Sequence, residues 1–164
     1  MTIFIKNKYT VLIDEFKFKC CIGKKGSTRT KIEGDKKTPK GTFEIENLYF
    51  RKDRKVKPLT SLKCIEIKKN MGWCNDIRFP NKYNKLIKIK ETVKHEQLKR
   101  KDYKYNYLLV IKYNSNNIIK NKGSAIFLHL TKNFKKTSGC IAVRENDFLV
   151  ISKLLNRNSK ISIN

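Results

Sequence analysis

Short segments in which apolar and polar residues alternate recur along most of the chain, and they constrain its fold more than any other feature. Examples are Thr2–Ile5, Tyr9–Ile13 and Phe16–Ile22, which are separated by Lys/Asn and Asp-Glu turns. Successive side chains of a β-strand point to opposite faces, so this alternation predicts strands with one buried face. We expect a mainly β fold with little helix (α+β), built as a mixed sheet or sandwich with a C-terminal helix.

The same pattern, or a short apolar run, predicts strands in the rest of the chain. These are Thr42–Phe50, Cys64–Ile67, Lys85–Lys90, Tyr107–Tyr113, Ala125–Leu130, Cys140–Val143 and Lys160–Ile163. The glycine-rich polar stretch 23–41 predicts a long loop. Residues 51–59 are charged and predict an exposed connection. Residues 91–101 are ambiguous, and one or two helical turns are expected there.

One helix is expected near the C-terminus. Asn146 or Asp147 can cap its start, and an apolar face follows at helical spacing: Phe148, Ile151, Leu154 and Leu155. The chain has no internal repeat and no linker, and 39% of its residues are hydrophobic, which suffices for a core. We therefore expect residues 1–164 to form a single domain.

The formal net charge of +25 restricts the partners less than its size suggests. Lysines are spread along the chain, whereas a nucleic-acid-binding protein more often gathers them on one element with stacking aromatic residues. A solvated surface is the favoured interpretation, and attraction to an anionic polymer or to nucleic acid stays open. No apolar run is long enough to cross a bilayer. No secretory signal is visible at the start, so a cytoplasmic location, another export route or a different gene start are all open.

The five cysteines point to one unusual position. An odd number leaves at least one thiol unpaired, no pair has CxxC spacing, and the two histidines are not arranged with them as in a zinc site, so no metal is expected. Cys20, Cys21 and Cys64 lie in strand-like stretches, where a small buried side chain is the simplest explanation. Cys140 differs because the turn Thr137-Ser138-Gly139 leads directly into it.

His129 lies in a predicted buried strand eleven residues before Cys140. A thiol needs a nearby base in order to attack, and a strand holds a base rigidly. Glycine before the nucleophile permits a tight turn and lets backbone N–H groups approach a reacting carbonyl. The competing interpretation is a core histidine bonded to the backbone and a cysteine chosen for its small size.

The run His129 … Thr137-Ser138-Gly139-Cys140 resembles the signature of the L,D-transpeptidase catalytic domain (YkuD-type) family. Other segments resemble one branch of that family in the same order along the chain. They are Glu33-Gly-Asp-Lys-Lys-Thr-Pro-Lys-Gly-Thr-Phe43, Met71-Gly-Trp-Cys-Asn-Asp76, Tyr83-Asn84 and Gly123-Ser-Ala-Ile-Phe-Leu-His129. The resemblance extends from about Gly26 to the C-terminal strand.

The resemblance implies an enzyme that acts on peptidoglycan stem peptides without a cofactor. Cys140 would attack the carbonyl of the third stem residue and expel D-alanine, with His129 as general acid and base. Backbone N–H groups of Gly139 and Cys140, with Ser138, would hold the oxyanion. Crosslinking and carboxypeptidase outcomes stay open, as does the group that orients His129: a backbone carbonyl, Ser138 or Thr137. The family implies the cell envelope. We expect a monomer and no specific nucleic-acid partner.

The chain departs from the family pattern at two positions next to Cys140. Many members carry histidine where this chain has Ser138, and many carry arginine where it has Ala142, with Arg144 nearby but out of register. These differences indicate a shifted substrate preference.

Candidates for substrate binding lie in the other motifs. They are Trp73, Ser124 and Arg144, together with four that could bind a diaminopimelate amine: Asp76, Tyr83, Glu96 and Asp102. His95, among charged residues, is expected to be an exposed bystander, and Gly34, Pro39 and Gly41 are expected to shape a turn.

Two other functions stay open. One is a basic nucleic-acid-binding module whose catalytic turn is a relic, and the other is an enzyme with a hydrolytic or non-wall amide substrate.

Overall fold

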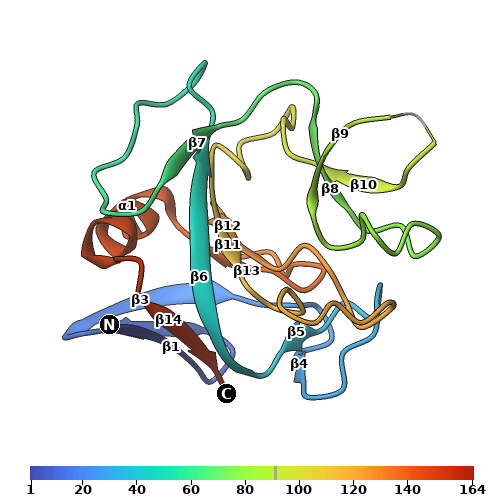
Figure 1. Ribbon diagram of the computed structural model, residues 1–164. Helices are drawn as coiled ribbons and strands as arrows, with labels where there is room; N and C mark the ends of the chain where they lie inside the picture. Colours follow the sequence, from blue (N-terminus) through green and yellow to red (C-terminus); the bar gives the residue numbers. More distant parts are fainter. Residues whose placement is uncertain (91) are drawn as a thin grey trace.

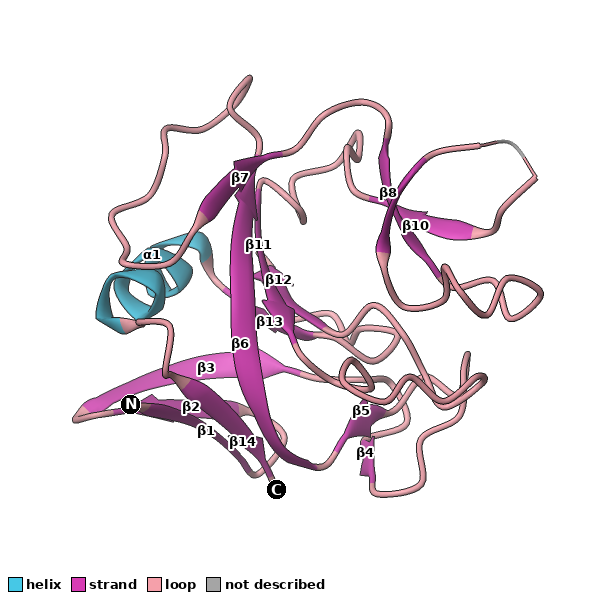
Figure 2. Ribbon diagram, viewed as in Figure 1, coloured by secondary structure: helices cyan, strands magenta, loops and turns pink. Residues whose placement is uncertain are grey.

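The computed structural model describes residues 1–90 and 92–164, and its main sheet closes into a ring of strands (Figures 1 and 2). The strand order is β11-β12-β13-β3-β2-β1-β14-β6-β7, and β6 also pairs with β11, which closes the ring. The bounds are β1 Thr2–Lys6, β2 Thr10–Ile13, β3 Phe16–Cys21, β6 Gly41–Phe50, β7 Cys64–Glu66, β11 Tyr107–Ile111, β12 Phe127–Leu130, β13 Ile141–Val143 and β14 Lys160–Ile163. The prediction of a mainly β fold with one C-terminal helix is confirmed.

Strand β6 joins the two halves of this ring. Its first residues pair with β14, in the register Gly41↔Ile163. Its last residues pair with β11 on one edge and with β7 on the other, in the registers Tyr49↔Leu108 and Tyr49↔Ile65. Figure 1 shows β6 running the height of the molecule. The sheet is mixed, because β1–β14, β6–β7 and β12–β13 are parallel pairs.

The core of the ring follows from the alternation in the sequence. Ile3, Ile5, Val11 and Ile13 are at most 1% exposed, and the intervening residues of β1 and β2 are less buried. Burial of such side chains is the main favourable contribution to folding. Cys20 and Cys21 are buried as expected, whereas Cys64 is half-buried.

The helix α1 (Glu145–Leu154) packs against this core through Phe148, whose ring stacks at 5.7 Å from that of Tyr107. The predicted cap was wrong. Arg144 is the N-cap and no side chain caps the helix, because β13 ends at Val143 and only one residue separates strand from helix. Within the described residues, no helix has the length and apolar character to span a membrane.

A small three-stranded sheet stands beside the ring (Figure 2) and consists of β8 (Met71–Cys74), β9 (Leu86–Lys88) and β10 (His95–Gln97). The strand at Met71–Cys74 was not predicted. The helical turns expected over 91–101 were wrong for the described residues 92–101, since Glu96 pairs with Trp73 across β10 and β8. Residue 91 lies outside the described residues.

His95 is half-buried, which corrects the expectation of exposure. Its Nδ1 bonds to the Val93 carbonyl at 2.7 Å. Its ring lies over Gly72, where a Cβ atom would approach the ring to 2.8 Å.

Two connections are more ordered than expected. The stretch 23–41 contains the short parallel pair β4 (Ser27–Thr28) and β5 (Thr38–Pro39). Arg51, at the start of the predicted exposed connection, is only 4% exposed. Its guanidinium pairs with Asp53 at 2.6 Å and donates to the Arg100 carbonyl at 2.6 Å.

Candidate active site

Cys140 and His129 line one cavity of about 580 Å³ beside the end of β12. Its walls also include the loop around Glu33, the strand β10 at Glu96 and the turn before Cys140. A larger hollow of about 730 Å³ lies around residues 50–57 and is lined by Cys64, but no histidine lines it. The cavity with both residues is therefore the candidate site.

The register of two parallel strands turns both side chains toward this cavity. His129 of β12 lies opposite Ala142 of β13, and both residues line the cavity. Cys140 lies two residues before Ala142, just outside β13, and also lines the cavity. The sulfur and the imidazole therefore face the same cavity from two neighbouring segments of the chain.

The imidazole of His129 is buried and held by its own strand. Its Nδ1 lies 3.0 Å from the carbonyl oxygen of Leu130. Only a protonated Nδ1 can donate to a carbonyl, so Nε2 carries the lone pair of the neutral ring. A backbone carbonyl orients the ring, and Ser138 and Thr137 do not bond to it among the described residues.

The free nitrogen of His129 opens to the cavity. Every buried side-chain nitrogen or oxygen of the described residues has a hydrogen-bond partner, yet Nε2 bonds to none of these residues. Nε2 is therefore accessible. Burial lowers the pKa of His129 to about 4, so the ring is neutral at neutral pH.

The thiol of Cys140 is also neutral. Its Sγ donates to the carbonyl oxygen of Ala125 at 3.3 Å, and within the described part of the chain it does not bond to His129. Burial raises the pKa of Cys140 to about 12. The resting pair is a neutral thiol and a neutral imidazole.

The turn before Cys140 is fixed by Thr137 and by a glycine that no other residue can replace without strain. Thr137 Oγ1 donates to the Cys140 carbonyl at 2.5 Å and accepts the Gly139 N–H at 3.1 Å. Gly139 has φ +142°, and a Cβ atom there would lie 3.0 Å from the Lys37 carbonyl oxygen. The Gly139 N–H is thus bonded within the turn, and its predicted role at an oxyanion stays a prediction. Ser138 is exposed and lines the cavity.

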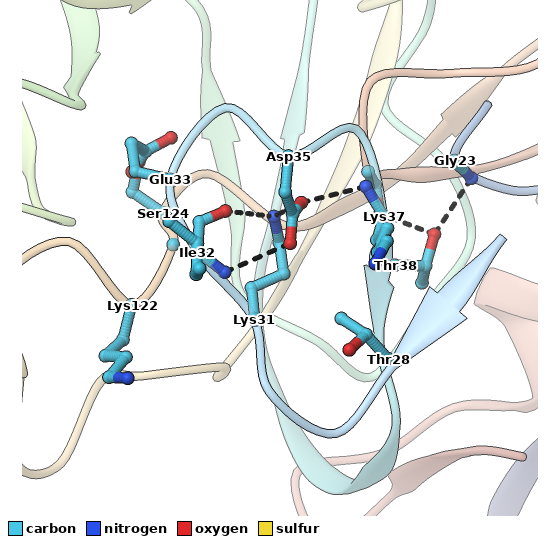
Figure 3. Close-up of polar contacts among 12 residues, drawn as sticks. Gly23, Thr28, Lys31, Ile32, Glu33, Asp35, Lys37, Thr38, Lys122 and Ser124 are labelled. Carbon is cyan, nitrogen blue, oxygen red and sulfur yellow. Dashed lines mark hydrogen bonds and ion pairs between the residues drawn. The ribbon is translucent and has the colours of Figure 1, made fainter. Parts of the chain in front are cut away.

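The loop 31–38 supports this turn through Thr38. Figure 3 shows the loop, with Asp35 beside Lys31 and Lys37, and Thr38 beside Gly23. Thr38 Oγ1 donates to the Gly139 carbonyl at 2.8 Å and accepts the Gly23 N–H at 2.9 Å. Asp35 closes the loop, because its carboxylate accepts from Lys31 Nζ at 2.5 Å and from the Lys37 N–H at 2.9 Å. From the sequence we expected this loop only to shape a turn, and its contact with Gly139 was not predicted.

Buried Asn84 holds the opposite wall. Its Oδ1 accepts the Trp73 indole N–H at 2.9 Å and the Ala125 N–H at 3.0 Å, and its Nδ2 donates to the carbonyls of Tyr113 and Asn114 at 2.9 and 2.8 Å. Ala125 has φ +52°, a left-handed conformation that costs a non-glycine residue about 1–2 kcal/mol. The residue that holds the Cys140 thiol is therefore itself held in a strained conformation by Asn84.

Two predicted substrate-binding residues lie outside the cavity lining, which corrects both predictions. Trp73 is 6% exposed and packs edge-on at 5.3 Å from Phe127, behind the wall. Arg144 lies at the start of α1 with its guanidinium 5.1 Å from the Phe134 ring centre. Ser124, in contrast, lines the cavity and donates to Glu33 at 2.6 Å.

Of the four residues considered for binding an amine, three are held within the structure and one lines the cavity. Asp76 is 2% exposed and caps its own loop by accepting from Arg78 and from the Lys94 N–H. Asp102 pairs with Arg100 at 2.7 Å. Tyr83 is fully buried. Glu96 lines the cavity, although Arg100 Nη1 at 3.1 Å and Tyr105 Oη at 2.9 Å already bind it.

The cavity lining carries more positive than negative charge. Six cations line it against two carboxylates, Glu33 and Glu96; the cations are Lys24, Lys31, Arg100, Lys104, Lys135 and Lys136. Such a lining favours a ligand with carboxylate groups. Within the described residues, no group of three or more His, Cys, Asp and Glu side chains is placed to hold a metal ion.

Comparison with known proteins gives one family and one related fold. Residues 2–163 match the family described as YkuD, L,D-transpeptidase catalytic domain. The structure of Bdellovibrio bacteriovorus Bd1075 resembles the chain with a TM-score of 0.50 and 14% identity, over 99% of this chain and 47% of that one. The chain thus spans about half the length of that structure, and the likeness concerns the fold. No curated protein matches the chain.

Proposed function

Since the chain belongs to the family of L,D-transpeptidase catalytic domains, we propose that it cleaves an amide of a peptidoglycan stem peptide through a thioester on Cys140. One observation carries the proposal: His129 of β12 and Cys140, the residue just before β13, line one cavity. The proposal takes residues 1–164 as one catalytic domain.

The first step begins from the neutral pair. The thiol leaves the Ala125 carbonyl and Sγ attacks the carbonyl carbon of the substrate amide, while Nε2 of His129 takes the thiol proton. The pKa of Cys140 is about 12 and that of His129 about 4, so the proton moves as the C–S bond forms rather than beforehand.

The charge on the substrate oxygen needs a donor at the turn. The Cys140 N–H makes no hydrogen bond to another described residue, and it is the donor we assign to the oxyanion. One such donor contributes about 3 kcal/mol to lowering the barrier. The Gly139 N–H can join only if it leaves Thr137.

The second half of the reaction releases the amine. The imidazolium of His129 gives its proton to the departing nitrogen, the C–N bond breaks and D-alanine leaves. The thioester then passes to an amine of a second stem or to water, and His129 takes the proton of the acceptor. A neutral thiol and imidazole are restored in both outcomes.

The test is release of D-alanine from a tetrapeptide stem by the wild-type chain and by Cys140→Ala. We expect release by the wild type, a thioester mass increase on Cys140, and no release by the variant. Cys64→Ala, a half-buried cysteine outside this cavity, is the control and should retain activity. Release by Cys140→Ala would contradict the proposal.

The acceptor is identified from the products of the same assay. A dimeric product indicates transfer to an amine, and a tripeptide indicates hydrolysis. We do not propose the nucleic-acid-binding alternative, because its support is the net charge of +25, which is spread along the chain.

A further inference from the structure

Thr38 is fully buried behind the cavity, where distant segments of the chain meet. Its Oγ1 accepts the Gly23 N–H at 2.9 Å, a bond that Figure 3 shows, and donates to the Gly139 carbonyl at 2.8 Å. A hydroxyl group has a single proton to donate. The N–H of Gly23 can only donate, so the proton of Thr38 is left for the carbonyl of Gly139.

The backbone on both sides of Thr38 fits too closely to shift. A Cβ atom at Gly23 would lie 2.5 Å from the Lys36 carbonyl oxygen, and one at Gly139 would lie 3.0 Å from the Lys37 carbonyl oxygen. Two glycines therefore let the segment 36–38 approach the turn and the start of the loop at once. The hydroxyl of Thr38 is held at a fixed place behind the turn.

The carbonyl that Thr38 binds belongs to the same peptide group as the Cys140 N–H. A trans peptide group is planar, and its C=O and N–H bonds point in opposite directions. The carbonyl of Gly139 points toward the buried Thr38, so the Cys140 N–H points away from it. Gly139 and Cys140 both line the cavity. The side of this peptide group opposite Thr38 is therefore the side that a substrate approaches.

Thr38 is the one partner that holds this peptide group among the described residues. Thr137, the other hydroxyl at the turn, binds the Gly139 N–H and the Cys140 carbonyl, which belong to the peptide groups before and after it. The Cys140 N–H has no partner among the described residues. The direction of this N–H thus depends on the bond from Thr38.

We propose that Thr38 is a positioning residue for the reaction: its hydroxyl fixes the Gly139–Cys140 peptide group so that the Cys140 N–H faces the substrate oxygen that gains negative charge. This inference rests on the proposed function, in which that N–H is the oxyanion donor, and adds a residue outside the cavity lining. Thr38 does not touch the substrate. A donor that is already oriented needs no rearrangement as the charge forms, and this makes it effective.

The test compares two reactions of the Cys140 thiol that differ in whether an oxyanion forms. With p-nitrophenyl acetate the S–C bond forms, the carbonyl oxygen carries the negative charge, the C–O bond then breaks and p-nitrophenolate leaves. With iodoacetamide the S–C bond forms as iodide leaves, and no carbonyl oxygen gains charge. In both reactions His129 takes the thiol proton. Both rates are followed as the mass increase of the peptide that contains Cys140.

Thr38→Val keeps the branched shape of the side chain and removes its hydroxyl. We expect acylation by the ester to fall at least about tenfold, as for a displaced oxyanion donor, while alkylation keeps the wild-type rate. Thr38→Ser restores the hydroxyl and should regain most of the acylation rate. An equal fall of both rates, an unchanged acylation rate, or a Thr38→Ser variant as slow as Thr38→Val would overturn the inference.

Ser152→Ala is the matched control for the loss of a buried hydroxyl. Ser152 lies on α1 outside the cavity lining, and its Oγ donates to the Leu149 carbonyl at 2.9 Å. This variant should keep both rates, and a selective loss of acylation in it would overturn the role of Thr38. Thr38→Ala, which also lacks the hydroxyl, takes the place of Thr38→Val if that variant does not fold, with the same expected result.

D-alanine release from the tetrapeptide stem separates this inference from the proposed function. For Thr38→Val we expect a lower kcat at unchanged KM, because the oxyanion exists only after the bound substrate is attacked. A selective loss of ester acylation supports the role of Thr38 even if the wild type releases no D-alanine. D-alanine release by Thr38→Val at the wild-type kcat overturns that role and leaves the proposed function intact. A wild type that is alkylated but not acylated by the ester also overturns it.

Discussion

The ring of strands and the cavity wall beside it are built on different physical principles. In the ring, apolar side chains of alternating residues such as Ile3, Ile5 and Leu109 meet inside a closed ladder of backbone hydrogen bonds. In the wall, single buried polar residues tie distant segments together. Asn84 joins residues 73, 113, 114 and 125, and Thr38 joins residues 23 and 139.

We therefore expect the ring to determine stability and the wall to determine the geometry that the reaction needs. Loss of apolar volume in the ring lowers the free energy of unfolding but leaves the geometry around Cys140 in place. Loss of one polar anchor in the wall removes several hydrogen bonds at once and displaces the group that holds the thiol. Four changes test whether the two regions behave in this way.

The largest effect on stability is expected in the ring. Leu109 is 1% exposed, and Leu109→Ala should lower the free energy of unfolding by about 2–5 kcal/mol. Below the melting temperature its kcat/KM should match the wild type. Urea unfolding and D-alanine release measure the two quantities. A loss of activity in the folded variant would contradict the separate roles of the ring and the wall.

His129 lies where the ring faces the wall, and it links stability to pH. Its pKa is lowered from 6.5 to about 4 on folding, so only the unfolded chain takes up a proton between these values. Stability is therefore fully present above pH 6.5 and is lost as the pH falls toward 4, by about 3 kcal/mol. Urea unfolding at several pH values should show this loss in the wild type. His129→Gln should lack this part of the pH dependence, and an identical profile in both proteins would contradict the prediction.

Asn84→Ala should lower both stability and activity, in contrast to Leu109→Ala. The change leaves the buried Trp73 and Ala125 N–H groups without an acceptor and lowers stability by about 1–3 kcal/mol, while displacement of Ala125 lowers kcat/KM by at least about tenfold. Asn47→Ala, on β6 outside the cavity, is the matched control. If Asn84→Ala lowered stability without lowering kcat/KM, the wall would contribute to stability only.

The smallest effect is expected at Ala125. Ala125→Gly relieves the left-handed strain at φ +52° and should raise the free energy of unfolding by about 1 kcal/mol. If Asn84 holds this strain, Ala125 can relax in Asn84→Ala, so Ala125→Gly should raise the free energy of unfolding less in that background than in the wild type. Strict additivity in the double variant would show that Asn84 does not hold this strain.

The ring could be predicted from the sequence and the wall could not, for one reason. Alternation marks Ile3, Ile5 and Val11 as buried wherever they occur, because apolar side chains have no other favourable place. A polar residue gives the same pattern in the sequence whether it is exposed or buried with hydrogen-bond partners. Asn84 and Arg51 therefore gave no sign of their burial, and the strand Met71–Cys74 was missed because Gly72 interrupts its pattern.

The candidate site was predicted in part. Resemblance to a family led to Cys140 and His129, and the structure places them in one cavity. The neutral state of both groups depends on burial, which a linear sequence does not state. Glu33 was overlooked as a lining residue of this cavity, because its loop is far from Cys140 in the sequence and meets it only in the fold.

The position of β14 between β1 and β6 has a consequence for synthesis of the chain on the ribosome. The N-terminal hairpin can form early, but its edge finds a partner only when residues 160–163 have emerged. Pairing over such a separation carries a high entropic cost and is slow. The nascent chain must therefore remain an open sheet with a bare edge, exposed to aggregation and to chaperones, until residues 160–163 have left the exit tunnel.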